Sequence, residues 1–146
     1  MRCPQRLAQL GAIGLLIALP HLAAPATADE CPAAFAAQVL ALVNARRAPL
    51  GLPALQAAAH LDAIAAEHSQ AMAASGRLNH DGFAQRFLRS SGQTCVENLA
   101  TGLRQPDALV AAWWASPVHQ RNLVAPRLQR AGLASVAGFV TLFACD

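Results

Sequence analysis

Apolar residues repeat at helical spacing through the first half of this chain and at strand spacing near its end. A first amphipathic helix is predicted to begin at Pro32 and to end before Pro49. Its apolar stripe comprises Phe35, Val39, Leu42 and Val43. A second helix is predicted over residues 57–74. Its stripe comprises Leu61, Ile64, Ala65, His68 and Met72.

Shorter elements are predicted in the remainder of the chain. They are helices over 81–89, 106–114 and 117–124, a strand over 95–100, and two strands within 130–145 around Ala137-Gly138. Residues 139–144 are apolar on both alternating faces apart from Thr141. A strand that is apolar on both faces is covered by helices on both sides. The pattern therefore predicts a three-layer α/β/α sandwich with a small, mostly antiparallel sheet between helices.

The N-terminus has the pattern of a secretory signal peptide. Arg2 and Arg6 precede an apolar run over 7–19, and Ala26-Thr27-Ala28 matches an A-x-A cleavage site. The apolar run is too short to span a bilayer comfortably, which disfavours a retained membrane anchor. We therefore expect a signal peptide over 1–28, a secreted or periplasmic mature chain over 29–146, and no transmembrane anchor in it.

Removal of the signal peptide leaves one domain with nearly balanced charge. The 118 residues that remain carry nine arginines, no lysine and eight acidic residues. A chain of this length buries enough surface for its own core. Because the arginines form no basic block or stripe, nothing favours nucleic-acid binding.

Three cysteines remain in the predicted mature chain, which is an odd number for an oxidising compartment. Cys95 and Cys145 would be neighbours if their strands lie side by side and antiparallel. Cys31 and Cys145 would instead join the two chain ends. We favour the first pairing, which leaves Cys31 free or able to link two chains into a disulfide-linked dimer.

The candidate chemistry lies in His80, Glu97 and His119. His80 follows an Ala-rich helical run, Glu97 is the one acid in an apolar strand, and His119 lies in the first turn of a short helix. Two imidazoles and a carboxylate suit a divalent-metal site or acid–base catalysis. His68, on the apolar stripe of the second helix, is better explained as a hydrogen-bonded core histidine.

The segments 42–47, 97–102 and 113–123 resemble the CAP superfamily of cysteine-rich secretory, antigen 5 and pathogenesis-related proteins, in particular its bacterial secreted branch. The resemblance extends from about Phe35 to Phe143 and implies the same α/β/α sandwich. It also implies that His80, Glu97 and His119 line a cleft that can hold a divalent cation. The family's second glutamate, sought in the helix before His119, has no counterpart in this chain, and Val96 and Val118 stand where glycines are usual.

Local chemistry adds two expectations. If Ser116 caps its helix, His119 is the third helical residue, where the unpaired N–H groups and the helix dipole lower the pKa of an imidazole. Glu97 should be buried, and a buried carboxylate needs a partner or takes a raised pKa. An imidazole N–H donor or a bound cation would satisfy it. Alternatively, the three residues form a polar network that only holds elements together.

Two functional classes follow. The first is a binding module whose cleft holds a divalent cation, a small polar ligand or a lipid, or which contacts another extracellular protein. Zinc is the most plausible cation, held by His80 and His119 with Glu97 as third ligand or outer acceptor. The second is a hydrolase in which the same residues activate water. Cys95 as a nucleophile is less favoured than a disulfide there.

Overall fold

The computed structural model describes residues 32–146, so the predicted signal peptide, its cleavage site and Cys31 lie outside the described part. The helices are α1 (Pro32–Arg47), α2 (Ala59–Ser75), α3 (Phe83–Arg89), α4 (Pro106–Ala115) and α5 (Pro117–Leu123), with a 3-10 turn η1 (Ala48–Leu50). The strands are β1 (Gln56–Ala57), β2 (Cys95–Thr101), β3 (Arg130–Val136) and β4 (Phe139–Cys145).

The four strands form one sheet in the order β1-β3-β4-β2. Strands β3 and β4 form an antiparallel hairpin, β2 pairs antiparallel with β4, and β1 pairs parallel with β3. The central strand β4 is buried from Val140 to Cys145 on both of its faces. The predicted small, mostly antiparallel sheet is therefore confirmed.

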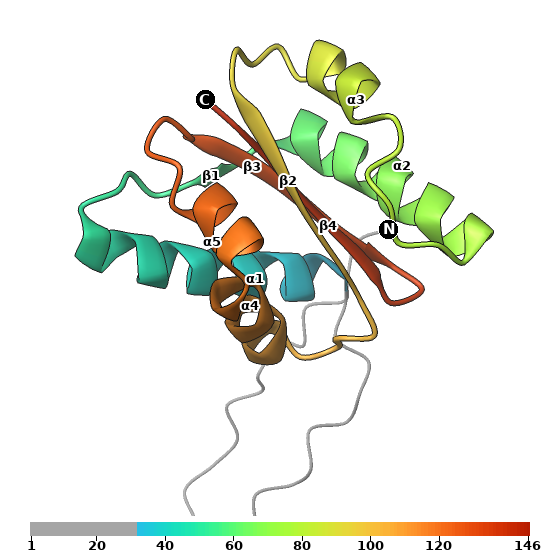
Figure 1. Cartoon of the computed structure of the whole chain (residues 1–146), viewed down its shortest axis with the longest axis horizontal. Helices are drawn as coiled ribbons and strands as arrows, with labels where there is room; N and C mark the ends of the chain where they lie inside the picture. Colours follow the sequence, from blue (N-terminus) through green and yellow to red (C-terminus); the bar gives the residue numbers. More distant parts are fainter. Residues whose placement is uncertain (1–31) are drawn as a thin grey trace, which may run out of the picture. The chain divides into compact units, whose positions relative to one another are not determined.

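Helices cover both faces of the sheet (Figure 1), with α2 and α3 on one face and α1, α4 and α5 on the other. The residues of β4 alternate between these layers. Val140, Leu142 and Ala144 pack in the main core with α1, α4 and α5, whereas Phe143 packs with Leu61 and Ile64 of α2. This arrangement confirms the three-layer sandwich.

Helix α2 lies unusually close to the sheet because Gly132 has no side chain. A β-carbon at Gly132 would lie 2.0 Å from the carbonyl carbon of Leu61. At the same contact, the carboxylate of Asp62 accepts a hydrogen bond from the backbone N–H of Leu133 (2.9 Å). Gly132 and Asp62 thus fix the seating of the helix that precedes the His80 loop.

Strand β2 is an edge of the described sheet, and side chains cover its outward carbonyls. The indole N–H of the buried Trp113 donates to the carbonyl of Leu99 (3.0 Å), and the Asn122 amide donates to the carbonyl of Glu97 (3.2 Å). Free strand edges favour aggregation. Here α4 and α5 satisfy the edge and are thereby placed beside the strand that carries Glu97.

Cys95 and Cys145 stand opposite each other on β2 and β4 and form a disulfide, which confirms the pairing that we favoured. It joins the start of β2 to the end of β4, and Cys95 precedes Glu97 by two residues. Within residues 32–146, no helix has the length and apolar character needed to cross a membrane.

The element boundaries differ from the predictions mainly around β1. The second helix begins at Ala59 instead of residue 57, because Gln56 and Ala57 pair with Arg130 and Ala131. The third helix begins at Phe83 instead of residue 81. Gly82 before it adopts a left-handed conformation (φ 77°), which ends the His80 loop.

Candidate functional site

Glu97 lies in the middle of β2 with its carboxylate buried against α3. Only 1 % of its side chain is exposed. The guanidinium of Arg86 donates from Nε to Oε2 (2.7 Å) and from Nη2 to Oε1 (2.8 Å), a two-pronged ion pair. Arginine is the side chain best suited to such pairing. The partner that the sequence required for Glu97 is thus Arg86 of α3, together with an imidazole.

That imidazole belongs to His80, in the loop between α2 and α3. Its Nδ1 lies 2.8 Å from Glu97 Oε1, and 57 % of its side chain is exposed. Because the ionised carboxylate only accepts hydrogen bonds, Nδ1 carries the proton and donates. In the neutral form of the ring, the other nitrogen, Nε2, then has a free lone pair. A buried carboxylate thus orients an imidazole whose free nitrogen can bind a metal or accept a proton.

His68 of α2 lies beneath this pair. It is 5 % exposed, its Nε2 donates to the carbonyl of Asn79 (2.9 Å), and the same nitrogen is 3.8 Å from Glu97 Oε1. Burial lowers the pKa of His68, although the charge of Glu97 opposes the shift. The interpretation of His68 as a hydrogen-bonded core histidine is therefore confirmed, and its contact supports the chain just before His80.

His119 is the third residue of α5 and is half-buried. Burial, and then the charge of His80, lower the pKa of His119. The expected direction is confirmed, but the cause that we inferred from the helix dipole is not the one found. Ser116 does occupy the N-cap position of α5, yet its side chain makes no capping hydrogen bond.

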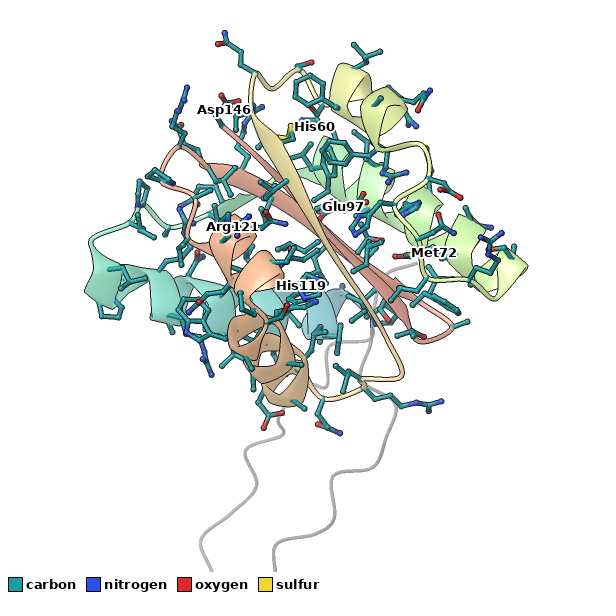
Figure 2. All side chains as sticks on the ribbon, viewed as in Figure 1. His60, Met72, Glu97, His119, Arg121 and Asp146 are labelled. Carbon is teal, nitrogen blue, oxygen red and sulfur yellow. A yellow bond between two sulfur atoms is a disulfide. The ribbon has the colours of Figure 1, made fainter. Side chains whose placement is uncertain are left out.

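Two asparagines connect the helix of His119 to the strand of Glu97. The buried Asn98 donates from its amide to the carbonyl of His119 (3.1 Å), and Asn122 donates to the side-chain oxygen of Asn98 (2.8 Å). Asn122 also donates to the carbonyl of Glu97. These bonds tie α5 to the outer edge of β2, so both histidines border the strand of Glu97 (Figure 2 labels Glu97 and His119).

The three predicted residues therefore gather around one strand, but in two different ways. His80 and Glu97 are in direct contact, whereas His119 is linked to them through Asn98 and Asn122 and through the effect of the His80 charge. In residues 32–146, no three His, Cys, Asp or Glu side chains converge as a ready-made metal site. Every fully buried side-chain nitrogen and oxygen of the described chain has a hydrogen-bond partner.

Arg86 is the residue of this cluster that sequence reasoning missed. A signal for it existed, because Arg86 follows Phe83 by three residues and so shares its face of α3. Phe83 packs on Phe143, whose strand position is opposite Glu97. An arginine on the inward face of a short helix is a natural partner for a buried acid.

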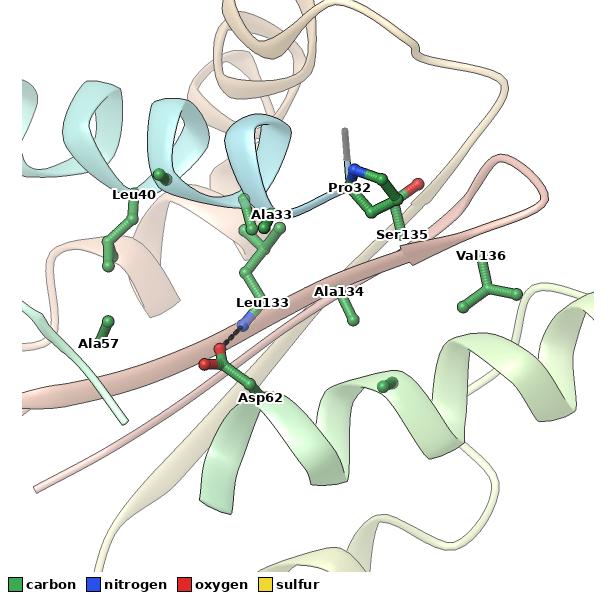
Figure 3. A pocket seen from close by; sticks show the side chains of 12 residues that line it. Pro32, Ala33, Leu40, Ala57, Asp62, Leu133, Ala134, Ser135 and Val136 are labelled. Atoms are coloured by element: carbon green, nitrogen blue, oxygen red, sulfur yellow. Dashed lines mark hydrogen bonds between the residues drawn. The ribbon is translucent and has the colours of Figure 1, made fainter. Parts of the chain in front are cut away.

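One cavity borders the cluster, and a larger one lies away from it. The smaller, about 220 Å³, borders the His80 loop and is lined by polar groups that include His68, Arg77 and Asp81. The larger, about 550 Å³, lies at the far edge of the sheet between α1, α2 and β3 (Figure 3). Half of its lining residues are alanines, Leu40 and Leu133 add larger apolar side chains, and none of His80, Glu97 or His119 contributes to it.

Comparison with known proteins agrees with the fold and with the motifs. Residues 40–142 match the profile described as CAP, the cysteine-rich secretory protein family. The Bacillus subtilis protein YkwD is 30% identical over 129 residues, which cover 77% of this chain and 50% of that protein. The chain thus spans about half the length of this curated relative.

Solved bacterial structures share the fold. An extracellular SCP-domain protein of Bacillus anthracis has a TM-score of 0.75 at 23% identity. The match covers 79% of this chain and 41% of the Bacillus anthracis chain. A cysteine-rich secretory protein of Staphylococcus aureus has a TM-score of 0.73 at 16% identity, covering 84% and 40%. An outer surface protein of Borrelia burgdorferi has a TM-score of 0.65 at 23% identity, covering 74% and 90%.

Proposed function

The chain belongs to the cysteine-rich secretory protein (CAP) family, and we propose that it is an exported binding domain that holds a divalent cation, preferably zinc, through His80 and His119. In this proposal Glu97 is the outer acceptor that fixes the His80 ring and not a direct ligand. Export rests on the signal-peptide pattern of residues 1–28.

The observation that carries the proposal is that the His80 side chain is largely exposed although one of its ring nitrogens is bonded to a buried carboxylate. A network that served only to hold elements together would bury both ring nitrogens, yet more than half of this side chain is exposed while its Nδ1 is fixed to a buried carboxylate. Metal-bound histidines commonly donate a hydrogen bond from the N–H of their second ring nitrogen to a carboxylate in this manner. The lowered pKa of His119 favours the neutral imidazole that ligation requires.

Two imidazoles also fit the chemistry of zinc better than that of magnesium or calcium, which prefer oxygen ligands. A bound zinc ion would polarise a water or a polar ligand at its open positions. With two protein ligands, affinity near micromolar is expected, about 4 kcal/mol weaker than nanomolar.

Titration calorimetry with zinc at about pH 7.5 tests the proposal. His80→Ala and His119→Ala should each abolish binding. His119→Ala should leave the free energy of unfolding nearly unchanged, whereas His80→Ala should lower it modestly, because the buried Glu97 loses one donor and keeps Arg86. The exposed His60 offers a matched control, and His60→Ala should bind like the wild type. Affinity should also fall on acidification, as protonation of the imidazoles competes with zinc, and the lowered pKa of His119 moves that competition at its ring to a lower pH. A wild type without zinc binding, combined with histidine variants that lose stability markedly, would identify a purely structural network.

A hydrolase is the second candidate, because the contact between His80 and Glu97 also resembles a base held by an orienting acid. Cys95 is in a disulfide, so water would be the nucleophile, with His80 Nε2 accepting its proton. Turnover of peptide, ester or phosphodiester substrates that is lost in His80→Ala and kept in His60→Ala would favour this candidate.

A further inference from the structure

We propose that Arg86 is the positioning residue of this site and determines which cations it accepts. The inference rests on the proposed function. By holding the carboxylate of Glu97, Arg86 keeps that group away from the cation, so that only imidazole nitrogens serve as protein ligands. The site then takes nitrogen-preferring cations, such as zinc and cobalt, and rejects oxygen-preferring ones, such as manganese.

The contacts of Arg86 reach both parts of the site. Besides its two bonds to Glu97, Arg86 donates from Nη1 to the carbonyl of Asp81 (2.7 Å) and from Nη2 to the carbonyl of His80 (3.4 Å). The guanidinium of Arg86, a residue that is only 7 % exposed, therefore joins strand β2 to the backbone of the His80 loop. Gly82 leaves the room for it, because a β-carbon there would lie 3.3 Å from Nη1.

Hydrogen-bond capacity explains why Oε1, the Glu97 oxygen in contact with His80, is not available to the cation. A carboxylate oxygen accepts about two hydrogen bonds. Oε1 of Glu97 accepts one from His80 and one from Arg86, and Oε2 accepts another from Arg86. The carboxylate is also almost fully buried, so a cation at Nε2 of the largely exposed His80 side chain meets neither a free Oε1 nor an uncompensated negative charge.

The charge of Arg86 determines which cations the site disfavours. Manganese, magnesium and calcium bind through carboxylates and other oxygens. The positive charge of Arg86 cancels that of Glu97 beside the cleft. Without Arg86, the carboxylate would be free to turn toward a cation and supply both an oxygen ligand and a negative charge.

The test compares cobalt and manganese binding in the wild type, Arg86→Met, Arg86→Lys and the double variant Arg86→Met/Glu97→Gln. The wild type should prefer cobalt, and Arg86→Met should reduce that preference at least about tenfold by gaining manganese affinity. The double variant removes both charges and should restore the wild-type preference. Arg86→Lys keeps the charge and should stay folded if Arg86→Met does not. It lacks the two-pronged geometry and should lose about tenfold in cobalt affinity.

A measurement without metal keeps the two proposals separate. Nitrogen-15 NMR of the imidazoles should find His80 protonated at Nδ1 in the wild type and in a mixture of tautomers in Arg86→Lys. The wild type could bind neither cation while the tautomer of His80 still differs between the wild type and Arg86→Lys. That result would refute the proposed function and the cation selectivity, and it would support Arg86 as a positioning residue. Folded variants with unchanged cation preference and unchanged tautomer would refute the inference, with the proposed function intact.

Discussion

Glu97 shows how far a single residue can be understood from sequence. An acid within an apolar strand predicts burial, and burial predicts a partner. The partner set could not be predicted in full, because it depends on how the short helix α3 turns its inward face. The structure provides Arg86 and His80 together, where the sequence suggested an imidazole or a cation.

Stability should fall when the pH decreases below about 6.5, because of His68. Its folded pKa is lowered by burial, so the unfolded chain takes up a proton at a higher pH than the folded chain does. Between the two pKa values the free energy of unfolding should decrease by at most about 1.4 kcal/mol per pH unit. The lowered pKa of His119 acts in the same direction.

Urea unfolding at a series of pH values measures this slope. His68→Gln retains a side-chain N–H for the carbonyl of Asn79 but cannot titrate, and its slope should be shallower. A free energy of unfolding that rises on acidification from pH 7 to pH 5, or an equal slope in the variant, would contradict this assignment.

At the level of elements, periodicity identified the long helices and the β3–β4 hairpin. The continuous apolar run of residues 139–144 correctly predicted a strand buried on both faces. The two-residue strand β1 could not be predicted, since its only basis is pairing with Arg130 and Ala131 far along the chain. The contact of α5 with β2 could not be predicted from the sequence either, because it depends on Asn98 and Asn122 and not on an apolar stripe.

Asn98→Ala should weaken both the fold and the site. It removes the bond to the carbonyl of His119 and one of the two bonds that the Asn122 amide donates, at a cost of about 1–3 kcal/mol in the free energy of unfolding. Zinc affinity should fall as well, because α5 is then held to β2 by fewer hydrogen bonds.

Asn44→Ala is the matched control for this variant. Asn44 also makes two side-chain bonds, both to the backbone of Leu55, away from the histidines. Its loss should reduce stability by a similar amount and leave zinc affinity unchanged when both variants are compared by urea unfolding and calorimetry. Equal losses of affinity in the two variants would show that Asn98 acts only through general stability.

For the whole molecule, the sandwich was predictable because helices must cover a sheet that is apolar on both faces. The family motifs identified the three candidate residues, but not that the loop between α2 and α3 brings His80 to one edge strand and α5 brings His119 to the same strand. That arrangement follows from the strand order, which places β2 at the edge. The relative YkwD is about twice as long as the part of it that this chain matches.

The exported protein should begin at Asp29 and contain one cysteine outside the Cys95–Cys145 disulfide. Native thiol counting should therefore find one free thiol per monomer, on Cys31, or a disulfide-linked dimer that Cys31→Ser abolishes with thermal stability nearly intact. N-terminal sequencing gives the cleavage site. An exported chain that retains residue 1, or that contains three free thiols, would refute this part of the account.

The most direct test of the central claim is a crystal structure of the zinc-soaked protein with data collected at the zinc absorption edge. We predict one anomalous peak at about 2.0–2.1 Å from His80 Nε2 and from a ring nitrogen of His119, with Glu97 still paired to Arg86. No peak between the two histidines would contradict the account, as would a zinc ion bound directly by Glu97 with Arg86 displaced.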